Sequence, residues 1–290
     1  MQYPGLFISV DSAAGEQQKR FFTFKAVELL ALGLGALAGT FGVQTLSGVP
    51  GIFAVLCFVA AVAIRLSRAG ETAEKRWYDA RAAAESIKSL SWQYAVAGEA
   101  FRAGDPDPEG AFTSQLRQIL RAAVPHLDVP APRSADVGAV TDVMRSLRTA
   151  SRDERCRHYQ LARIDDQVDW YARKAKWNKR RSRAWSYAVV VIELSAVAAG
   201  IARVNGMIDV DLLGVFGAAS AGLLAWVQAK NYTQLSESYA VTSHEVALVS
   251  GAVRADVSEQ IWAQSVHDAE AAFSREHTLW LARRQSLQAN

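Results

Sequence analysis

Two regions of this 290-residue sequence almost lack charged side chains. No Asp, Glu, Lys or Arg occurs in residues 29–64, a run of 36. Only Glu193 and Arg203 interrupt the apolar run 184–204, and residues 212–229 are again uncharged. A surface helix of a soluble domain carries polar residues on its outer face, and a disordered chain is polar throughout. The uncharged runs therefore exclude both classes.

Cysteine and the common cofactor motifs are also scarce. The two cysteines are Cys57, inside an apolar run, and Cys156, in a polar segment, so we expect no disulfide and exclude a disulfide scaffold. The chain has no Walker glycine loop with its lysine, and His244-Glu245 lacks the second histidine of a zinc motif. We predict no metal site, no cofactor and no enzymatic activity.

The lengths of the apolar runs predict four membrane-spanning helices. One helix needs about 20 apolar residues to cross a hydrocarbon core of about 30 Å, so a run of 36 fits two crossings with a break at Pro50. The polar turn 205–209 divides the second region in the same way. The predicted spans are about 26–46, 50–66, 184–204 and 211–229. The fold class is therefore an all-α membrane protein with two transmembrane helical hairpins.

Lysine and arginine lie at the outer ends of both hairpins and are almost absent from the turns. Because cytoplasmic flanks are enriched in these residues, we expect a multi-pass protein with both termini and the middle segment in the cytoplasm. The largest basic cluster, which we expect to contact anionic lipid, comprises Arg173, Lys174, Lys176, Lys179, Arg180, Arg181 and Arg183. A cluster beside the membrane does not favour nucleic acid as a partner.

The segments between and after the hairpins predict long cytoplasmic helices. Residues 71–103 form a helical pattern, and prolines mark a linker at 125–132. No glycine or proline occurs from 139 to 199, which predicts a helix of some 50 residues leading into the third span. Its apolar steps of three and four predict a coiled-coil-like seam, at positions His158, Leu161, Ile164, Val168, Tyr171 and Ala175. We place two domains at 1–132 and 133–290.

The C-terminal segment repeats this pattern. A second seam is predicted at Tyr239, Thr242, Val246, Val249 and Val253. Ser258 is a candidate cap of a last helix, whose apolar positions include Trp262, Val266, Phe273 and Trp280.

Two carboxylates inside the apolar regions are the strongest site candidates. Ionisable residues in membrane spans usually face a bundle interior or water, so Glu28 and Glu193 are candidates for pore lining or gating. The alternative is a packing carboxylate bound to a neighbouring helix or lying near the headgroups. Pairs of small residues that permit close helix packing are Gly35 and Gly39, Ala196 and Gly200, and Ala218 and Gly222. Packing within and between chains both remain open.

Both halves of the chain resemble one family. Val27-Glu28-Leu29 matches Ile192-Glu193-Leu194 at an offset of 165, which suggests two copies of a hairpin unit. The stretches Glu74-Lys75-Arg76-Trp77-Tyr78-Asp79-Ala80-Arg81 and Arg163-Ile164-Asp165-Asp166-Gln167-Val168-Asp169-Trp170-Tyr171 resemble the SLATT family of bacterial two-transmembrane domains, with two subtypes fused. The resemblance implies a pore-forming effector of the inner membrane, encoded beside nucleotide-signalling proteins in anti-phage systems. A simple member has one hairpin, whereas this chain has two and no sensor domain.

Together these features predict an oligomeric gated pore or ion channel. Four spans are too few to enclose a wide aqueous pore, so we expect a homo-oligomer around a symmetry axis. The expected partners are membrane lipid, further copies of the chain, and a cytoplasmic activator or nucleotide-signalling partner. Two alternatives remain open: a non-conducting scaffold that clusters a cytoplasmic partner, and a small-cation transporter that uses both glutamates.

Overall fold

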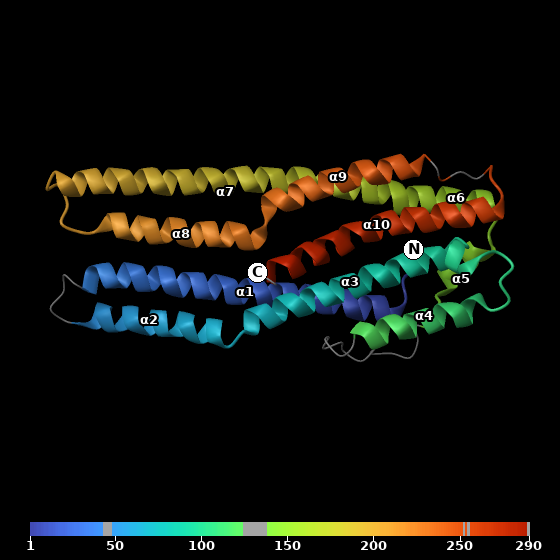
Figure 1. Cartoon of the computed structure of the whole chain (residues 1–290), viewed down its shortest axis with the longest axis horizontal. Coiled ribbons are helices and arrows are strands. Elements are labelled where there is room, and N and C mark those ends of the chain that lie inside the picture. Colours follow the sequence, from blue (N-terminus) through green and yellow to red (C-terminus); the bar gives the residue numbers. More distant parts are fainter. Residues whose placement is uncertain (43–47, 124–137, 252, 254–255, 289–290) are drawn as a thin grey trace. The chain divides into compact units, whose positions relative to one another are not determined.

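A computed structural model describes residues 1–42, 48–123, 138–251, 253 and 256–288. Within these ranges every regular element is a helix and none is a strand (Figure 1), which confirms the all-α prediction. The helices in chain order are α1 (Gly5–Gly42), α2 (Val49–Leu66), α3 (Ala69–Ala95), η1 (Glu99–Phe101), α4 (Pro108–Ala123), α5 (Asp142–Thr149), α6 (Arg152–Tyr159), η3 (Gln160–Asp165), α7 (Asp166–Val204), α8 (Leu212–Lys230), α9 (Tyr232–Ser250) and α10 (Glu259–Gln288).

The chain divides into two compact units. The first, the core unit, comprises residues 1–16, 75–175 and 237 onward, and the second, the span unit, comprises residues 17–74 and 176–236. Both halves of the sequence therefore contribute to each unit.

The span unit contains the predicted membrane helices. The described residues include four helical stretches long and apolar enough to cross a membrane, at Gly5–Phe41, Val49–Leu66, Arg152–Val204 and Leu212–Ser250, which confirms the four spans. Only 6% to 17% of the residues in their apolar windows are buried. Most of this hydrocarbon surface is therefore left for lipid or for another chain to cover. The first helix begins at Gly5, well before the predicted span at 26, because the polar segment ahead of the span is also helical.

Local residues account for the described parts of both hairpin turns. Gly48 precedes α2 with a φ of 66°, a conformation that glycine adopts without strain. At the second turn, Gly206 has a φ of 69°. The Asp211 carboxylate then accepts a hydrogen bond from the Gly214 amide at 3.3 Å and so caps α8. It also pairs with Arg203 at 2.7 Å, which ties the two ends of this turn together. The end of the first predicted span, residues 43–46, lies outside the described residues.

The core unit has two hydrophobic clusters. The first joins α1, α3, α4 and α5, and its α3 face contains Ala80, Ala84, Ile87 and Tyr94, all at most 1% exposed. The second joins α3, α6, α7, α9 and α10 around Trp92 and Trp262. As predicted, Ser258 caps α10 by accepting a hydrogen bond from the Ile261 amide at 3.3 Å, and Val266 and Phe273 are buried. The Trp280 side chain lies outside the described side chains.

The positions of the predicted seam before the third span are buried in its second half and exposed in its first, and a coiled coil there stays a prediction. Ile164, Tyr171 and Ala175 are buried as expected, whereas His158 and Leu161 are exposed. The reason is the π-helical turn η3, which takes more residues per turn than an α-helix and so shifts the buried face. Ahead of η3 the buried positions are Arg155 and Tyr159, and inside η3 they are Arg163 and Ile164.

The long helix that leads into the third span begins later than residue 139, where the segment without glycine or proline starts. The Ser151 hydroxyl accepts a hydrogen bond from the Glu154 amide at 3.3 Å, and this cap starts α6 at Arg152. From there α6, η3 and α7 form one helical stretch of 53 residues that ends at Val204. The predicted helical continuity between the segment ahead of the third span and the span itself is therefore present.

Candidate functional site

Glu193 is an exposed carboxylate in the middle of an apolar helix. It lies on α7 nine residues after Ala184, which is about 14 Å along the helix at about 1.5 Å per residue. The Ser220 hydroxyl on α8 donates a hydrogen bond to Oε1 of Glu193 at 3.2 Å. Among the described residues no lysine, arginine or histidine forms an ion pair with it. Its own hairpin thus supplies one hydroxyl and no counter-charge.

The surface around Glu193 is hydrocarbon. Val190, Leu194 and Val197 are 49%, 64% and 57% exposed, and they lie one turn before, beside and one turn after the carboxylate. An ionised carboxylate at the centre of a bilayer is unfavourable by about 2.5 to 3.5 kcal/mol on insertion scales. On this side of α7, the Glu193 carboxylate is therefore unfavourable in contact with lipid, whereas the apolar side chains around it are suited to lipid.

Glu28 has the opposite environment, although it occupies the equivalent place in the repeat. Its side chain is only 9% exposed. Arg65 donates to its Oε1 from Nε at 2.9 Å and from Nη2 at 2.6 Å, and Lys25 donates to its Oε2 at 3.3 Å. Arg65 is the last residue but one of α2, so this ion pair closes the end of the first hairpin. The geometry matches the packing alternative, and a pore-lining role for Glu28 stays a prediction.

Three of the predicted small residues contact the other helix of their own hairpin. A Cβ atom at Gly35 would lie 3.2 Å from the Phe58 ring and 3.3 Å from Cβ of Cys57, both on α2. A Cβ at Gly39 would lie 3.9 Å from Ala54. In the second hairpin, a Cβ at Gly200 would meet the Leu213 side chain at 3.6 Å. These glycines bring the two helices of each hairpin together.

Two glycines of α8 have no close neighbour on another helix. A Cβ atom added at Gly217 or Gly222 would meet nothing within 4 Å. Gly217 and Ala221 are exposed on one face of α8, while Ala196 and Ala218 are half-buried. Sequence reasoning identified Ala218 and Gly222 but missed Gly217, because only the structure shows which small residues are left without a neighbour.

All seven cations of the predicted lipid cluster on α7 are exposed. Arg181 lies over the Trp177 ring at 5.3 Å from its centroid, and Lys174 lies over the Trp170 ring at 5.7 Å. Cations with exposed charge and adjacent aromatic rings suit the membrane interface. Contact with anionic lipid remains a prediction.

The core unit contains a buried ion pair that the sequence patterns did not identify. Arg163 in η3 donates to Glu270 on α10 from Nε at 2.9 Å and from Nη2 at 2.7 Å, and the two side chains are 2% and 0% exposed. The Tyr159 hydroxyl donates to the same carboxylate at 2.9 Å. Arg163 also stacks over Phe273 at 4.4 Å. The pair fixes α10 against the π turn.

Electrostatics favour a charged Arg163 and a protonated Tyr159 in this cluster. Burial alone disfavours the charged guanidinium, but the Glu270 carboxylate outweighs it and raises the pKa of Arg163. Burial raises the pKa of Tyr159 well above its ordinary value, so the phenol stays a donor. The only sequence signal was that Arg163 begins one of the two stretches that resemble the SLATT family.

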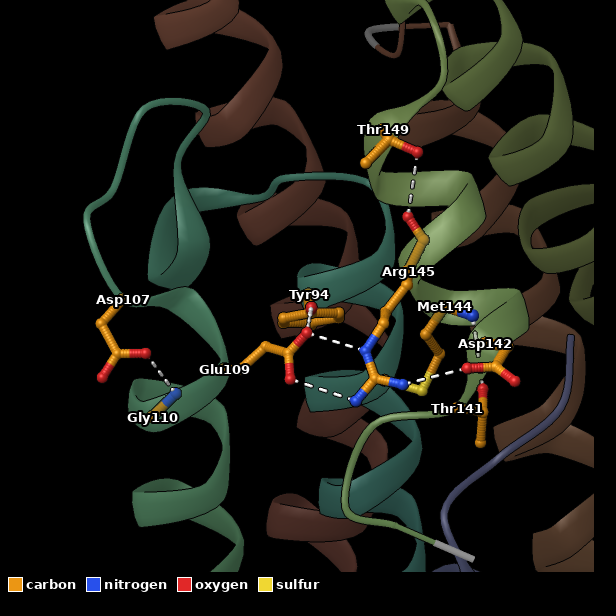
Figure 2. A network of polar contacts seen from close by, with 9 residues as sticks. All are labelled: Tyr94, Asp107, Glu109, Gly110, Thr141, Asp142, Met144, Arg145 and Thr149. Carbon is orange, nitrogen blue, oxygen red and sulfur yellow. Dashed lines mark hydrogen bonds and ion pairs between the residues drawn. The ribbon is translucent and has the colours of Figure 1, made fainter.

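A second polar network, on the surface of the core unit, joins α3, α4 and α5. Figure 2 shows the Arg145 guanidinium between Glu109 and Asp142, with contacts of 2.8 and 3.2 Å to the Glu109 oxygens and 3.0 Å to Asp142. The Tyr94 hydroxyl donates to Glu109 at 3.4 Å. The Arg145 hydrogen bond lowers the pKa of Glu109. This network fastens α5 to α4, and we assign it a structural role.

No group of three or more His, Cys, Asp or Glu side chains that could hold a metal occurs among the residues that the structure describes.

These features define a multi-pass helical membrane protein built from two hairpins. Comparison with known families identifies the same unit twice. Residues 4–156 match the family described as SMODS and SLOG-associating 2TM effector domain 3, and residues 159–280 match SMODS and SLOG-associating 2TM effector domain 1. The chain belongs to the SLATT family of two-transmembrane effector domains and carries two of them in tandem. No curated protein and no solved structure matches it. The domain boundary that we placed at 132–133 stays a prediction.

Proposed function

We propose that several copies of this chain assemble a gated pore in the inner membrane of a bacterium, with both termini in the cytoplasm. In this proposal the pore is the effector of a stress or anti-phage signalling system, and no catalytic residue is needed. The observation that carries the proposal is Glu193, an exposed carboxylate that lies in the middle of a membrane span and has no counter-ion in the described part of the chain.

The energetics of Glu193 favour assembly around water. Ionisable groups within spans are tolerated where they face a bundle interior or an aqueous cavity. Ser220 contributes a single hydrogen bond, which leaves the second carboxylate oxygen for another solvating group. In a ring of copies, one Glu193 from each chain would face a central axis, where water solvates the charges and cations are attracted.

The open face of α8 supports contact between copies. Gly217 has no side-chain or backbone neighbour within 4 Å of an added Cβ atom, and Ala221 is exposed on the same face. Without a hydrophobic driving force between helices in lipid, small residues favour association because they allow two backbones to approach closely. A second chain could therefore pack against α8 at this face.

The helix that carries Glu193 offers a route for gating. The stretch Arg152–Val204 is helical without a break, and Asp166 to Glu193 is 27 residues, or about 40 Å of helix at about 1.5 Å per residue. A tilt of α7 that begins near η3 would move Glu193 directly. The association of the family with SMODS and SLOG proteins supports an activator produced by nucleotide signalling.

The test is ion flux with a single substitution. Wild-type protein in liposomes should conduct ions when an extract of phage-infected host cells supplies the activator. Glu193→Gln should lower the preference for cations over anions, because it removes one charge per copy from the pore. Asp209→Asn, which removes a charge in the turn outside the predicted spans, should retain the wild-type preference. An oligomer that never conducts would instead support the scaffold alternative.

A further inference from the structure

The span unit has an open groove between α1 and α8. It encloses about 560 Å³. On α1 its lining includes Gln18, Lys19, Phe22 and Val27, and on α8 it includes Trp226 and Lys230. None of the described residues that line it is acidic. The groove thus combines two amines, two aromatic rings and an apolar end.

Lys230 is held inside this groove by aromatic rings. Its Nζ lies 3.2 Å from the centroid of the Phe22 ring and 4.7 Å from that of the Trp226 ring. The two rings are 5.9 Å apart in an edge-on arrangement. Within the described ranges, no carboxylate forms an ion pair with Lys230. Lys230 is half-buried, the two rings position its ammonium group, and its N–H donors are left for a ligand.

Polarity changes in the same direction along both walls of the groove. On α1, Lys19 precedes Val27 by eight residues, about 12 Å at about 1.5 Å per residue, and Val27 lies in the first predicted span. On α8, Trp226 lies one turn deeper in the span than Lys230, which is the last residue of the helix. Both helices thus place amines at the membrane border and apolar or aromatic groups further in.

We propose that this groove binds an anionic phospholipid. The phosphate would lie between Lys19 and Lys230, and the part of the acyl chain nearest the headgroup would lie against Val27. A phospholipid presents the same order of chemistry, from phosphate to hydrocarbon, and aromatic rings are favoured at the level between them. Basic pockets between membrane helices are a recognised form of headgroup site. A zwitterionic lipid fits less well, because its own ammonium group would meet two lysines and no carboxylate. The inference depends on the membrane spans and not on ion conduction.

The test measures binding of single lipids to the full chain in detergent micelles by native mass spectrometry. Phosphatidylglycerol is titrated against wild type and the double variant Lys19→Gln/Lys230→Gln. Each lysine attracts the lipid phosphate electrostatically, so losing both should weaken the first binding event about 30-fold. Lys19→Arg/Lys230→Arg keeps both charges and should stay within about threefold of wild type. Binding of phosphatidylcholine should be weak and equal in all variants.

A pair of exposed arginines controls for diffuse attraction. Arg117 and Arg121 are exposed on α4, outside both the groove and the predicted lipid cluster, so Arg117→Gln/Arg121→Gln should change the first binding event by less than about threefold. The proposal is overturned if this control weakens binding as much as the groove variant does. It is also overturned if the groove variant binds like wild type, if the arginine variant loses binding, or if millimolar inorganic phosphate displaces the lipid. None of these results depends on whether the protein conducts.

Discussion

Breaking the buried pair of Arg163 and Glu270 should destabilise the core unit strongly. In Arg163→Met, Glu270 would keep only the Tyr159 hydroxyl of its three hydrogen-bond donors while remaining fully buried. Removing one partner of a buried ion pair typically lowers the free energy of unfolding by about 3 to 5 kcal/mol. At about 2 to 4 °C per kcal/mol for a unit of this size, Tm should fall by about 6 to 20 °C.

The double substitution separates charge from packing. In Arg163→Met/Glu270→Leu no buried charge is left alone, and apolar replacements of whole ion pairs are often neutral. More than half of the Tm loss of Arg163→Met should therefore be recovered. Arg157→Met, the same change at an exposed position of α6, should shift Tm by less than about 2 °C.

Tryptophan fluorescence during heating in detergent reports this unfolding, because Trp92 and Trp262 are buried in the same cluster as Tyr159. The reasoning is refuted if Arg163→Met lowers Tm no more than Arg157→Met does. It is also refuted if the Tm losses of the single variants Arg163→Met and Glu270→Leu simply add in the double variant. Either result would mean that Arg163 and Glu270 are not energetically coupled.

Two further predictions concern contacts between copies and acid sensitivity. Gly217→Leu should leave each chain folded but weaken each interface by about 1 to 3 kcal/mol through overpacking, seen as smaller assemblies in mass photometry; an unchanged assembly would remove this face from the interface. Gly35→Leu should instead disrupt the first hairpin, because its Cβ already meets Phe58 at 3.2 Å. The lowered pKa of Glu109 predicts that its stabilisation by Arg145 is complete at neutral pH and is lost as the pH falls below the ordinary value of 4.5. The difference in Tm between wild type and Arg145→Gln should therefore shrink in acid, and a difference that does not vary with pH would contradict the assigned role.

The membrane helices could be predicted because lipid imposes a length and a composition on them. Uncharged runs and the breaks at Pro50 and 205–209 were sufficient for all four spans. The start of the first helix at Gly5 was not predicted, since a polar helical segment has no such signal. The seam before the third span failed at His158 and Leu161 because a single π turn changes which side of a helix faces the core.

The candidate site likewise has features that the sequence predicts and features that depend on tertiary contacts. Glu28 and Glu193 look equivalent in sequence, yet Arg65, 37 residues from Glu28, pairs with the first glutamate, and the second has only Ser220. The partnership of Arg163 and Glu270 spans 107 residues, and the groove at Lys19 and Lys230 joins the two hairpins of the chain. Contacts over such separations depend on tertiary packing, which periodicity in one segment does not encode.

The position of Glu193 in the assembled protein tests the central proposal most directly. A cryo-electron microscopy structure of the full chain in lipid nanodiscs would locate this side chain relative to the symmetry axis. We predict a closed ring in which Glu193 of every copy faces a water-lined axis and Gly217 lies at a contact between copies. A monomer, or an assembly whose Glu193 side chains point outward into lipid, would contradict the proposal.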